Sequence, residues 1–484
     1  MKLVWFFVLL ACACLGAWFA HLNTQQILAV TIFSSFILGT LLYWQFRLAF
    51  ALLGITALLA TRLIDIPHLI EFASVDIILF LVAMMIVIGF LEERRFFEVL
   101  MEKLLNKASR RAHLFFPTMM GLAMLSAALV DEVTSILFMT SLTLHLTRRL
   151  KLQAFPYVVM IVLATNIGSS ATVVGNPIGV LIALRAGLSF NDFLQWATPI
   201  SLAALGLTIA ICLIYFRKPL AELASGIRKT KEAVETEKYD KRELRRASIL
   251  FGLTLLGLVF HHQMEHLLNL PKNTLLLGVP FLMAGIALLI QGEKSRELVE
   301  KRVDWWTLAF FLLLFASVGT LRYVGVTDRL AGGLQALSGS HTVLLMGIIM
   351  AISGLLTAFL DNVLAVATFI PVIADLGKAG LPVFPLWWTL LFGGTLGGNA
   401  TMIGSTANIV AVGMLEREKE RVTFGRWLGP GLAVTLPTLI LAFLLLVLRL
   451  PLMHEQGKTG VHDEHDHGKE TIGRAEGRTE SAGF

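Results

Sequence analysis

The sequence predicts an all-α polytopic membrane protein, with about 11 transmembrane helices and two re-entrant helical hairpins in inverted-topology repeats. Three observations lead to this fold class. The 484-residue chain is 56% hydrophobic and only 15% charged, and its mean hydropathy is +0.75, which is too apolar for a soluble protein of this size. Apolar segments of roughly 17 to 25 residues, the length that a helix needs to cross a bilayer, recur along the chain. Two of these segments carry an acidic residue at their centre and match each other.

The distribution of charge supports a membrane location and argues against other classes. The net charge is +6, but Lys and Arg gather in short stretches between apolar segments, a pattern that orients membrane helices and does not indicate nucleic-acid binding. Cys12, Cys14 and Cys212 lie in apolar segments, so neither a disulfide framework nor a zinc site is expected. No HExxH or GxSxG motif occurs in the apolar segments, and we expect no enzymatic activity and no cofactor.

The N-terminal region predicts closely spaced membrane spans. Residues 1–25 are expected to form a first transmembrane helix that starts in the cytoplasm. The alternative is a cleaved signal peptide, because one lysine, an apolar run and small residues follow each other. Further spans are expected at 26–45, 48–63 and 76–91. They lead into the basic stretch "EERRFFEVLMEKLLNKASRRAH", which we place in the cytoplasm.

Two repeats are expected on either side of a polar cytoplasmic linker at 217–247. The first repeat covers 26–216 and the second covers 248–449. Residues 450–484 are expected to form a disordered tail outside the cell membrane, and its "VHDEHDHGKE" stretch would hold a divalent metal only weakly. The remaining predicted elements are a hairpin at 114–147, a broken helix at 155–186, spans at 194–216, 248–262, 273–291 and 304–323, a hairpin at 341–374, a broken helix at 384–415 and a span at 427–449.

The repeats are inferred from motifs that match at a nearly constant offset. "LVDEVTS" matches "FLDNVLA", which aligns Asp131 with Asp361. "GSSATVVG" (168–175) matches "GGNATMIG" (397–404) in the same order. The first acidic segment is expected to enter from the cytoplasm and the second from outside, so the halves would be inverted copies. Such repeats place a substrate site near the bilayer midplane, at their interface.

Each acidic segment has arms that are a little short for a complete span. The arms on either side of Asp131 cover 114–130 and 133–147, so we interpret them as a re-entrant hairpin with Asp131 and Glu132 at a buried tip. The alternative is two thin complete spans joined by an exposed Asp-Glu turn, which the charge distribution does not distinguish from a hairpin. The hairpin is preferred because the tip lacks the Gly or Pro of a surface turn and the second copy repeats the acid.

The stretches "TNIGSSATVVGNP" and "GGTLGGNATMIGSTAN" predict two discontinuous helices, because glycine, proline and small polar residues interrupt them. Close helix packing would explain the glycines, but it does not explain hydroxyl and amide groups at matched positions. Unwound backbone at membrane depth commonly lines an ion site. The predicted ion- or substrate-binding residues are Asp131, Glu132, Thr134, Asn166, Gly168, Ser169, Ser170, Thr172, Asn176, Asp361, Asn362, Asn399, Thr401, Ser405 and Asn408.

Acidic residues at membrane depth need a function that offsets their cost, which is at least ~2.5 kcal/mol each on insertion scales. Coordination of a cation, with a sodium site at Asp131 and Asp361, is one such function. Proton exchange is another, because a carboxylate can also take a proton. The alternative is that both acids are neutral caps that accept hydrogen bonds from local N–H groups.

Four segments, "SAALVDEVTS", "NIGSSATVVGNP", "AGLSFNDFLQWATP" and "GLLTAFLDNVLA", resemble the ion transporter superfamily with a citrate-transporter-like domain. The resemblance is greatest to the branch of arsenite permeases, D-type sodium/proton antiporters and the melanosomal P protein, and it covers roughly residues 50–450. It implies eleven helices, two opposed hairpins, inverted repeats and usually a homodimer that moves its substrate by an elevator-type motion.

The tips depart from the patterns of these relatives. Sodium-coupled dicarboxylate carriers have a Ser-Asn-Thr tip, whereas the acids here would repel a dicarboxylate unless a cation screened them. Relatives with acidic tips usually have Asp-Asn followed by Thr, but here Glu132 replaces the first amide and Leu364 replaces the second threonine. The expected function is therefore sodium/proton antiport, with sodium or a proton as coupling ion. The alternatives are a sodium- or proton-coupled permease for arsenite, a dicarboxylate or another oxyanion, and a channel.

Overall fold

The computed structural model describes all residues except 1, 98, 100–111, 230–239, 340 and 477–484. Every regular element in this described part is a helix. Among the described residues, eight helical segments are long and apolar enough to cross a membrane, and shorter apolar helices lie among them. The predicted all-α polytopic fold is therefore confirmed.

One set of helices, the flanking group, contains ordinary spans and their short connections. Its members are α1 (Lys2–Phe19), α2 (Thr24–Leu42), α3 (Arg47–Ala60), α4 (Ile66–Phe72), α5 (Val75–Glu93), α14 (Lys241–Leu268), α15 (Thr274–Gln291), α16 (Ser295–Arg302), α17 (Trp305–Tyr323) and α18 (Val326–Ser338). Within the group, α5 packs on α15 and α17, and α3 packs on α2 and α17. The side chain of Asn23 and that of Gln26 form a reciprocal capping box that starts α2.

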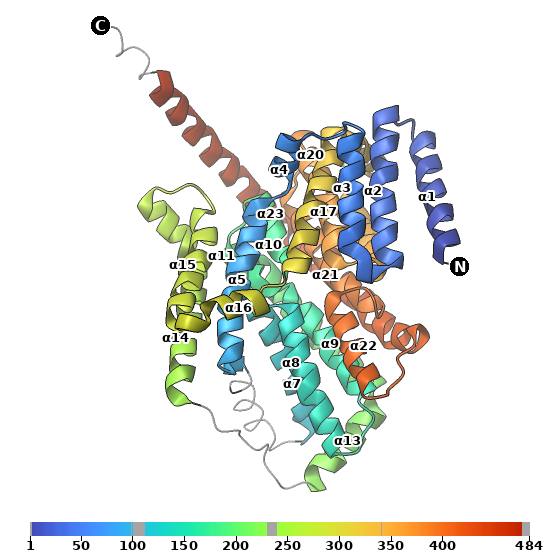
Figure 1. Ribbon diagram of the computed structural model, residues 1–484, viewed down its shortest axis with the longest axis vertical. Coiled ribbons are helices and arrows are strands. Elements are labelled where there is room, and N and C mark those ends of the chain that lie inside the picture. The colour runs from blue at the N-terminus through green and yellow to red at the C-terminus, as the bar shows by residue number, and fades with distance from the viewer. Residues whose placement is uncertain (1, 98, 100–111, 230–239, 340, 477–484) are drawn as a thin grey trace.

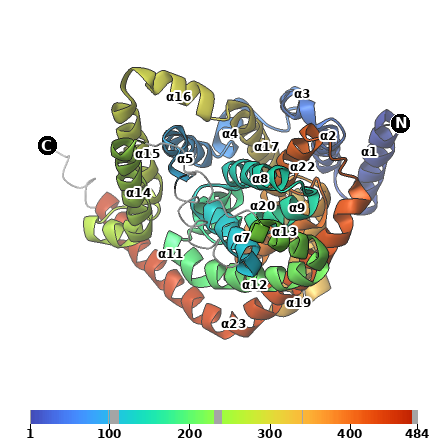
Figure 2. The same cartoon turned by 90° about the horizontal axis from the view of Figure 1, so that it is seen from below.

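A second set, the hairpin group, contains both predicted hairpins and both predicted broken helices. Its members are α7 (Ala112–Leu129), α8 (Glu132–Arg149), α9 (Phe155–Ser169), α10 (Pro177–Ala186), α11 (Phe190–Asp192), α12 (Thr198–Tyr215), α19 (Thr342–Phe359), α20 (Asn362–Lys378), α21 (Phe384–Leu396), α22 (Thr406–Arg417) and α23 (Phe424–Glu476). The hairpin α7–α8 lies in the lower half of Figure 1, whereas α20 lies in the upper half. Figure 2 shows α7, α8, α9 and α20 at the centre, with α14 and α15 on one side and α1, α2 and α3 on another.

The same backbone contacts hold the broken helix against the hairpin in each half. A Cβ atom on Gly168 would lie 2.2 Å from the carbonyl oxygen of Met124, and one on Gly397 would lie 2.6 Å from that of Gly354. Only glycine permits this approach, because real Cβ contacts are never so short. Short 3-10 turns interrupt the two broken helices at Val173–Gly175 and Gly397–Ala400. The matched glycines therefore mark equivalent packing positions of the two repeats.

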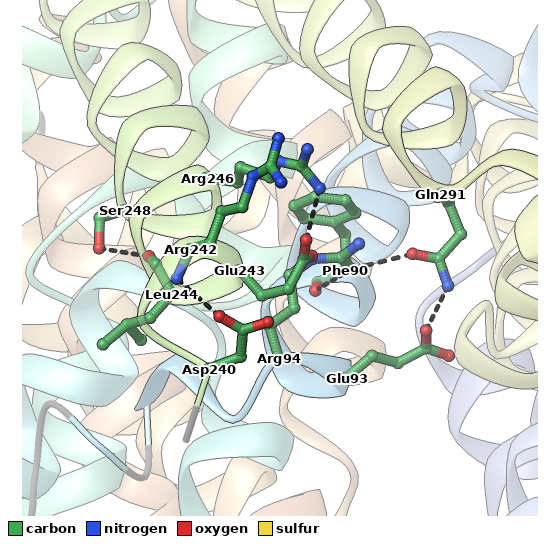
Figure 3. Close-up of polar contacts among 10 residues, drawn as sticks. All are labelled: Phe90, Glu93, Arg94, Asp240, Arg242, Glu243, Leu244, Arg246, Ser248 and Gln291. Atoms are coloured by element: carbon green, nitrogen blue, oxygen red, sulfur yellow. Dashed lines mark hydrogen bonds and ion pairs between the residues drawn. The ribbon is translucent and has the colours of Figure 1, made fainter.

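An ionic network ties the flanking helices together at one end, as Figure 3 shows. The Arg94 Nε donates to Glu243 (2.9 Å), and an Nη donates to Gln291 (2.8 Å), so one arginine joins α5 to α14 and to α15. Gln291 donates in turn to Glu93 (2.5 Å), and the Arg94 guanidinium lies 3.6 Å from the ring centre of Phe90. The planar guanidinium of arginine can donate to two partners and stack on an aromatic ring at once, so these contacts fix the relative positions of the helix ends.

Two segments differ from the sequence-based expectation. The region predicted as a polar linker contains the amphipathic helix α13 (Arg217–Lys229) and the start of α14 at Lys241. α13 is helical because its apolar residues repeat at helical spacing and Leu223 is buried against the protein. The region predicted as a disordered tail continues α23 as a helix to Glu476; residues 477–484 lie outside the described residues.

Candidate functional site

Both hairpin tips are built as helix N-caps. Asp131 Oδ1 accepts hydrogen bonds from the backbone N–H groups two and three residues later (2.7 and 2.9 Å). Asp361 Oδ1 accepts from the equivalent N–H groups of its own helix (3.0 and 3.4 Å). A carboxylate at this position satisfies backbone donors that the start of a helix leaves free and interacts favourably with the helix dipole. Each aspartate therefore caps its own helix through Oδ1, and its Oδ2 takes no part in the cap.

The two tips meet inside the protein. Asn362 Nδ2 donates to Glu132 Oε1 at 3.1 Å, with Oε2 at 3.4 Å. Glu132 is 3% exposed and Asn362 is 2% exposed. An exposed turn between two complete spans is therefore excluded, and the re-entrant hairpin is the observed structure. We call the polar region around these tips the chamber; it is formed by Asp131, Glu132, Ser169, Asn176, Asp361, Asn362 and Thr406.

The breaks in α9–α10 and α21–α22 each supply a polar cap. Asn176 Oδ1 accepts from two N–H groups at the start of α10 (2.7 and 3.2 Å), while its Nδ2 donates to Ser169 Oγ (3.1 Å) and lies 3.5 Å from Glu132 Oε2. Ser405 occupies the matched position of the second repeat and accepts from Asn408 N–H (3.2 Å) at the start of α22. Four helices, α8, α10, α20 and α22, therefore begin at polar caps near the tips. Discontinuous helices in membrane transporters commonly present their N-termini in this way.

A cluster of amides lies behind the chamber and joins the two broken helices. Asn166 Nδ2 donates to the side-chain oxygens of Asn399 and Asn408, both at 2.8 Å. Ser405 Oγ donates to Asn166 Oδ1 (3.1 Å), and Asn408 Nδ2 donates to the carbonyl oxygens of Gly398 and Thr401 (both 2.7 Å). Ser169 Oγ donates to the Asn166 carbonyl (2.9 Å), which links this cluster to the chamber. Because every member is satisfied, the cluster can hold the chamber in a defined geometry.

Several predicted ligands have their hydroxyl groups occupied elsewhere. Thr172 Oγ1 donates to the Ala128 carbonyl, and Thr401 Oγ1 donates to the equivalent Ala358 carbonyl. Ser170 Oγ donates to a carbonyl of its own helix (2.7 Å) and lies 2.8 Å from Ser201 Oγ on α12. These hydroxyls fasten the broken helices to their neighbours. Thr134 contributes its backbone N–H to the Asp131 cap, and Gly168 contributes close packing.

Thr406 belongs to the chamber and was missed by the sequence-based prediction. Its Oγ1 donates to Asp361 Oδ2 at 3.1 Å, so it binds the oxygen that the helix cap leaves free. The matched position of the first repeat is Pro177, which has no polar group. A search for polar residues shared by both repeats therefore could not find it.

The chamber contains three carboxylates without a direct counter-ion. Among the described residues, Asp131, Glu132 and Asp361 form no ion pair with Lys or Arg. The three are also not gathered into a three-carboxylate metal cluster in the described part of the chain. The amide nitrogens of Asn176 and Asn362 face Glu132, and the Thr406 hydroxyl donates to Asp361.

A cavity of about 750 Å³ lies between the two groups, and α17 and α20 supply much of its lining. Two ion pairs cross the boundary beside it. Arg185 of α10 binds Asp76 of α5 in a bidentate contact (2.9 and 3.0 Å), and Arg322 of α17 lies 3.5 Å from Asp375 of α20. In this conformation the hairpin group is thus held against the flanking group by contacts at the cavity rim.

The fold and the paired tips define a multi-pass membrane transporter built from two inverted halves that meet at the chamber. The chain belongs to the family described as citrate transporter, whose model matches residues 36–393 and 337–458. The predicted resemblance to proteins with a citrate-transporter-like domain is therefore confirmed.

Named relatives agree with this class. An uncharacterized transporter of Mycobacterium tuberculosis is 32% identical over 383 residues, which cover 77% of this chain and 86% of that protein. The P protein of Homo sapiens is 27% identical over 451 residues, which cover 76% of this chain and 53% of that protein. The crystal structure of the YdaH transporter of Alcanivorax borkumensis matches with a TM-score of 0.54 at 16% identity, covering 82% of this chain and 89% of that chain. This last likeness concerns the fold alone.

Proposed function

We propose that the protein is a secondary active antiporter that exchanges a monovalent cation, sodium, for protons. The observation that carries the proposal is the contact between Glu132 of the first tip and Asn362 of the second, in a chamber whose carboxylates form no ion pair with any Lys or Arg that the structure describes. A buried carboxylate without a partner is costly, and a bound cation or proton removes that cost.

The two ions would compete for the same oxygens. A carboxylate can coordinate sodium or hold a proton, but the same oxygen cannot do both at once. Asp361 and Glu132 can each offer carboxylate oxygens to sodium, the Thr406 hydroxyl oxygen lies beside Asp361, and Asp131 supplies further negative charge at the first tip. Mutually exclusive binding is the simplest basis for exchange, because each ion that enters the chamber displaces the other.

Access would alternate by movement of the hairpin group relative to the flanking group. The proposal is supported by the ionic network that ties α5, α14 and α15 together and by the cavity between α17 and α20. Inverted repeats commonly allow such rocking around a fixed site. We place the protein in the cell membrane as a homodimer, with the start of α7 and the N-terminus in the cytoplasm and the C-terminus outside.

A second candidate is a sodium- or proton-coupled permease for a small anion such as a dicarboxylate, arsenite or another oxyanion. The matched family is described as citrate transporter, and the positive ends of α8, α10, α20 and α22 suit an anion. However, Asp131 and Asp361 already occupy two of these helix starts. An anion would need a screening cation at each tip, so we place this function second.

The test is an ion-exchange assay in everted membrane vesicles that hold a pH gradient. Adding sodium or lithium should dissipate the gradient, with saturable kinetics and counterflow of labelled sodium. A gradient that is unaffected by sodium, in vesicles that show counterflow of a dicarboxylate or oxyanion, would replace the proposal with the second candidate. Sodium flux that neither saturates nor shows counterflow would indicate a channel.

A further inference from the structure

The cavity of about 750 Å³ between the two groups of helices has the size of a pocket for a drug-sized molecule. Helices α4 and α20 both pack on α17 beside it, and all three helices lie in the upper half of Figure 1. The wall that α20 supplies is apolar along much of its length, where Ala367, Ile370, Pro371 and Ala374 line the cavity. The hairpin group therefore offers a ligand an apolar surface.

The opposite wall, from the flanking group, carries a cluster of aromatic rings. The ring centres of His68 and Tyr323 are 4.6 Å apart, and the ring centre of Phe72 lies 5.7 Å from the first and 6.0 Å from the second. All three residues line the cavity. Gly319 allows α17 to approach α4 here, because a Cβ atom on it would lie 2.4 Å from the Cβ of Phe72. Such rings attract flat aromatic groups and organic cations.

The arginine and lysine residues of the cavity lining already have acidic partners. Arg185 forms a bidentate contact with Asp76 (2.9 and 3.0 Å). Arg322 and Lys378 both pair with Asp375, at 3.5 and 3.0 Å. An anionic ligand would have to compete with these carboxylates for the same cationic groups.

Two carboxylates of the lining have no such partner. Glu71 of α4 and Asp328 of α18 both line the cavity, and neither forms an ion pair with any residue that the structure describes. Glu71 and Phe72 lie one helical turn after His68, so the carboxylate and the two rings share one face of α4. The charges of the lining that are not neutralised by a neighbour are therefore negative and lie beside aromatic rings.

We propose that this cavity binds an amphiphilic organic monocation, a flat aromatic ring that carries an ammonium or guanidinium group. The ring packs between the aromatic cluster and α20, and the cationic end lies at Glu71 and Asp328. Because the ligand contacts both groups of helices, it holds them in their present relative position and inhibits exchange. This inhibition rests on the proposed function, whereas the binding itself does not.

Binding is tested with three molecules that share a naphthalene ring: naphthylmethyltrimethylammonium, which is a permanent cation, naphthalenemethanol, which is neutral, and naphthoate, which is an anion. Titration calorimetry on purified full-length protein in a neutral detergent measures each dissociation constant. The ammonium compound should bind most tightly and naphthoate least tightly, because the free charges of the lining are carboxylates.

Variants of the lining identify the site. In Glu71→Gln the dissociation constant for the ammonium compound should rise about threefold to fivefold, as expected for a partly exposed ion pair, while that for the alcohol stays the same. Asp328→Asn should act in the same direction. Tyr323→Leu removes a ring and should weaken binding of the ammonium compound and the alcohol alike. Glu300→Gln is the control for net charge, because Glu300 pairs with Arg296 on an exposed part of α16.

The proposal is overturned if the ammonium compound binds no more tightly than the alcohol, or if its affinity in Glu71→Gln and Asp328→Asn equals that in Glu300→Gln. Tightest binding of naphthoate would identify an anion site instead.

Exchange of labelled sodium in proteoliposomes gives a second measurement. The ammonium compound should slow this exchange, and Glu71→Gln should require a correspondingly higher concentration. If the compound binds as described but exchange is not slowed, the inhibition is wrong and the binding site stands. If the protein exchanges no sodium without the compound, the proposed antiport is overturned, and calorimetry still decides whether the binding site exists.

Discussion

Glu132 and Asn362 occupy equivalent positions in the two repeats, yet one is an acid and the other an amide. The amide donates to the acid across the meeting point of the tips. Two acids at these positions would repel each other, and two amides would leave the chamber with less charge. The difference between the repeats therefore allows the tips to meet while keeping a carboxylate at their contact.

The first prediction separates capping from ion binding at Asp131. In Asp131→Asn the remaining Oδ1 can still accept the two backbone hydrogen bonds, because asparagine is as good an N-cap as aspartate. We expect normal amounts of folded protein in the membrane but loss of sodium-dependent proton movement in vesicles. Asp240→Asn is the matched control, because Asp240 caps α14 in the same way at an exposed position. Undiminished exchange by Asp131→Asn would leave Asp131 with a capping role alone.

Much of the chamber could be predicted because its residues lie in sequence motifs that both repeats share. Asp131 and Asp361 were found from matched motifs, and the breaks in the helices follow from glycine and proline. The direction of each side chain was not predictable from its type, so Thr172 and Thr401 were expected in the chamber although their hydroxyls bind backbone carbonyls. The burial of Arg47 was also not predictable, because in sequence it resembles an ordinary basic residue between two spans; it depends on contacts with α17, 260 residues away.

At the scale of the elements, each broken helix depends on a backbone approach that only glycine allows. The second prediction concerns Gly168→Ala, where the new Cβ would meet the Met124 carbonyl at 2.2 Å. A backbone carbonyl cannot move aside as a flexible side chain can, so we expect Gly168→Ala to lower the free energy of unfolding by about 1 to 3 kcal/mol. This change can be measured by thermal unfolding of detergent-purified protein. Gly121→Ala, on the hairpin arm α7 with open space around it, should be neutral; equal effects would contradict this packing argument.

The third prediction concerns movement between the groups. A reversible bis-methanethiosulfonate cross-linker between Asp76→Cys and Arg185→Cys, in a background without the native cysteines, would fix α10 to α5 where the two side chains now form an ion pair. A cross-linker replaces the length of the arginine side chain, because a direct disulfide needs Cα atoms within roughly 7 Å. We expect exchange to stop on cross-linking and to recover on reduction. The control joins Arg148→Cys to Glu418→Cys in the same way, at a pair between α8 and α22 within the hairpin group. If both cross-links left exchange unchanged, the groups would not move relative to each other at this boundary.

The element boundaries agree closely with the sequence where breaks have strong local causes. The predicted broken helix at 155–186 begins and ends where α9 and α10 do, with Pro156 in the first turn and Gly187 in the left-handed conformation just after the end. The linker was less predictable. Its charged composition suggested irregular structure, but the amphipathic spacing of α13 lets it bury Leu223 against the protein.

At the scale of the whole molecule, the fourth prediction tests orientation in the membrane. A single cysteine replacing Lys272, between α14 and α15, should react with an impermeant thiol reagent from outside. One replacing Glu297 on α16 should react only from the cytoplasmic side, since α15 separates the two positions. Thiol labelling of each variant in right-side-out and in everted vesicles shows from which side each cysteine is accessible. The opposite pattern would invert the proposed topology, with both termini exchanged.

The equivalence of the two halves was predictable from the offset of the motifs, but their division into two packing groups was not. That division depends on long-range contacts, such as those of Arg94 with Glu243 and Gln291, which join segments about 150 to 200 residues apart. No local pattern encodes such pairings, because any exposed arginine could serve equally well.

With an amide at Asn362 the chamber has Asp131, Glu132 and Asp361 as its carboxyl groups, and their number limits how many protons the chamber can exchange for sodium in each cycle. If the total charge of the ions carried in one direction differs by one elementary charge from that carried in the other, the membrane voltage and the ion concentration ratios both drive the cycle. A voltage of 100 mV then contributes about 2.3 kcal/mol per turnover. Asn362→Asp adds a carboxyl group that can hold a proton, and is therefore expected to change the charge moved per exchange and with it the concentration ratio at which net flow reverses.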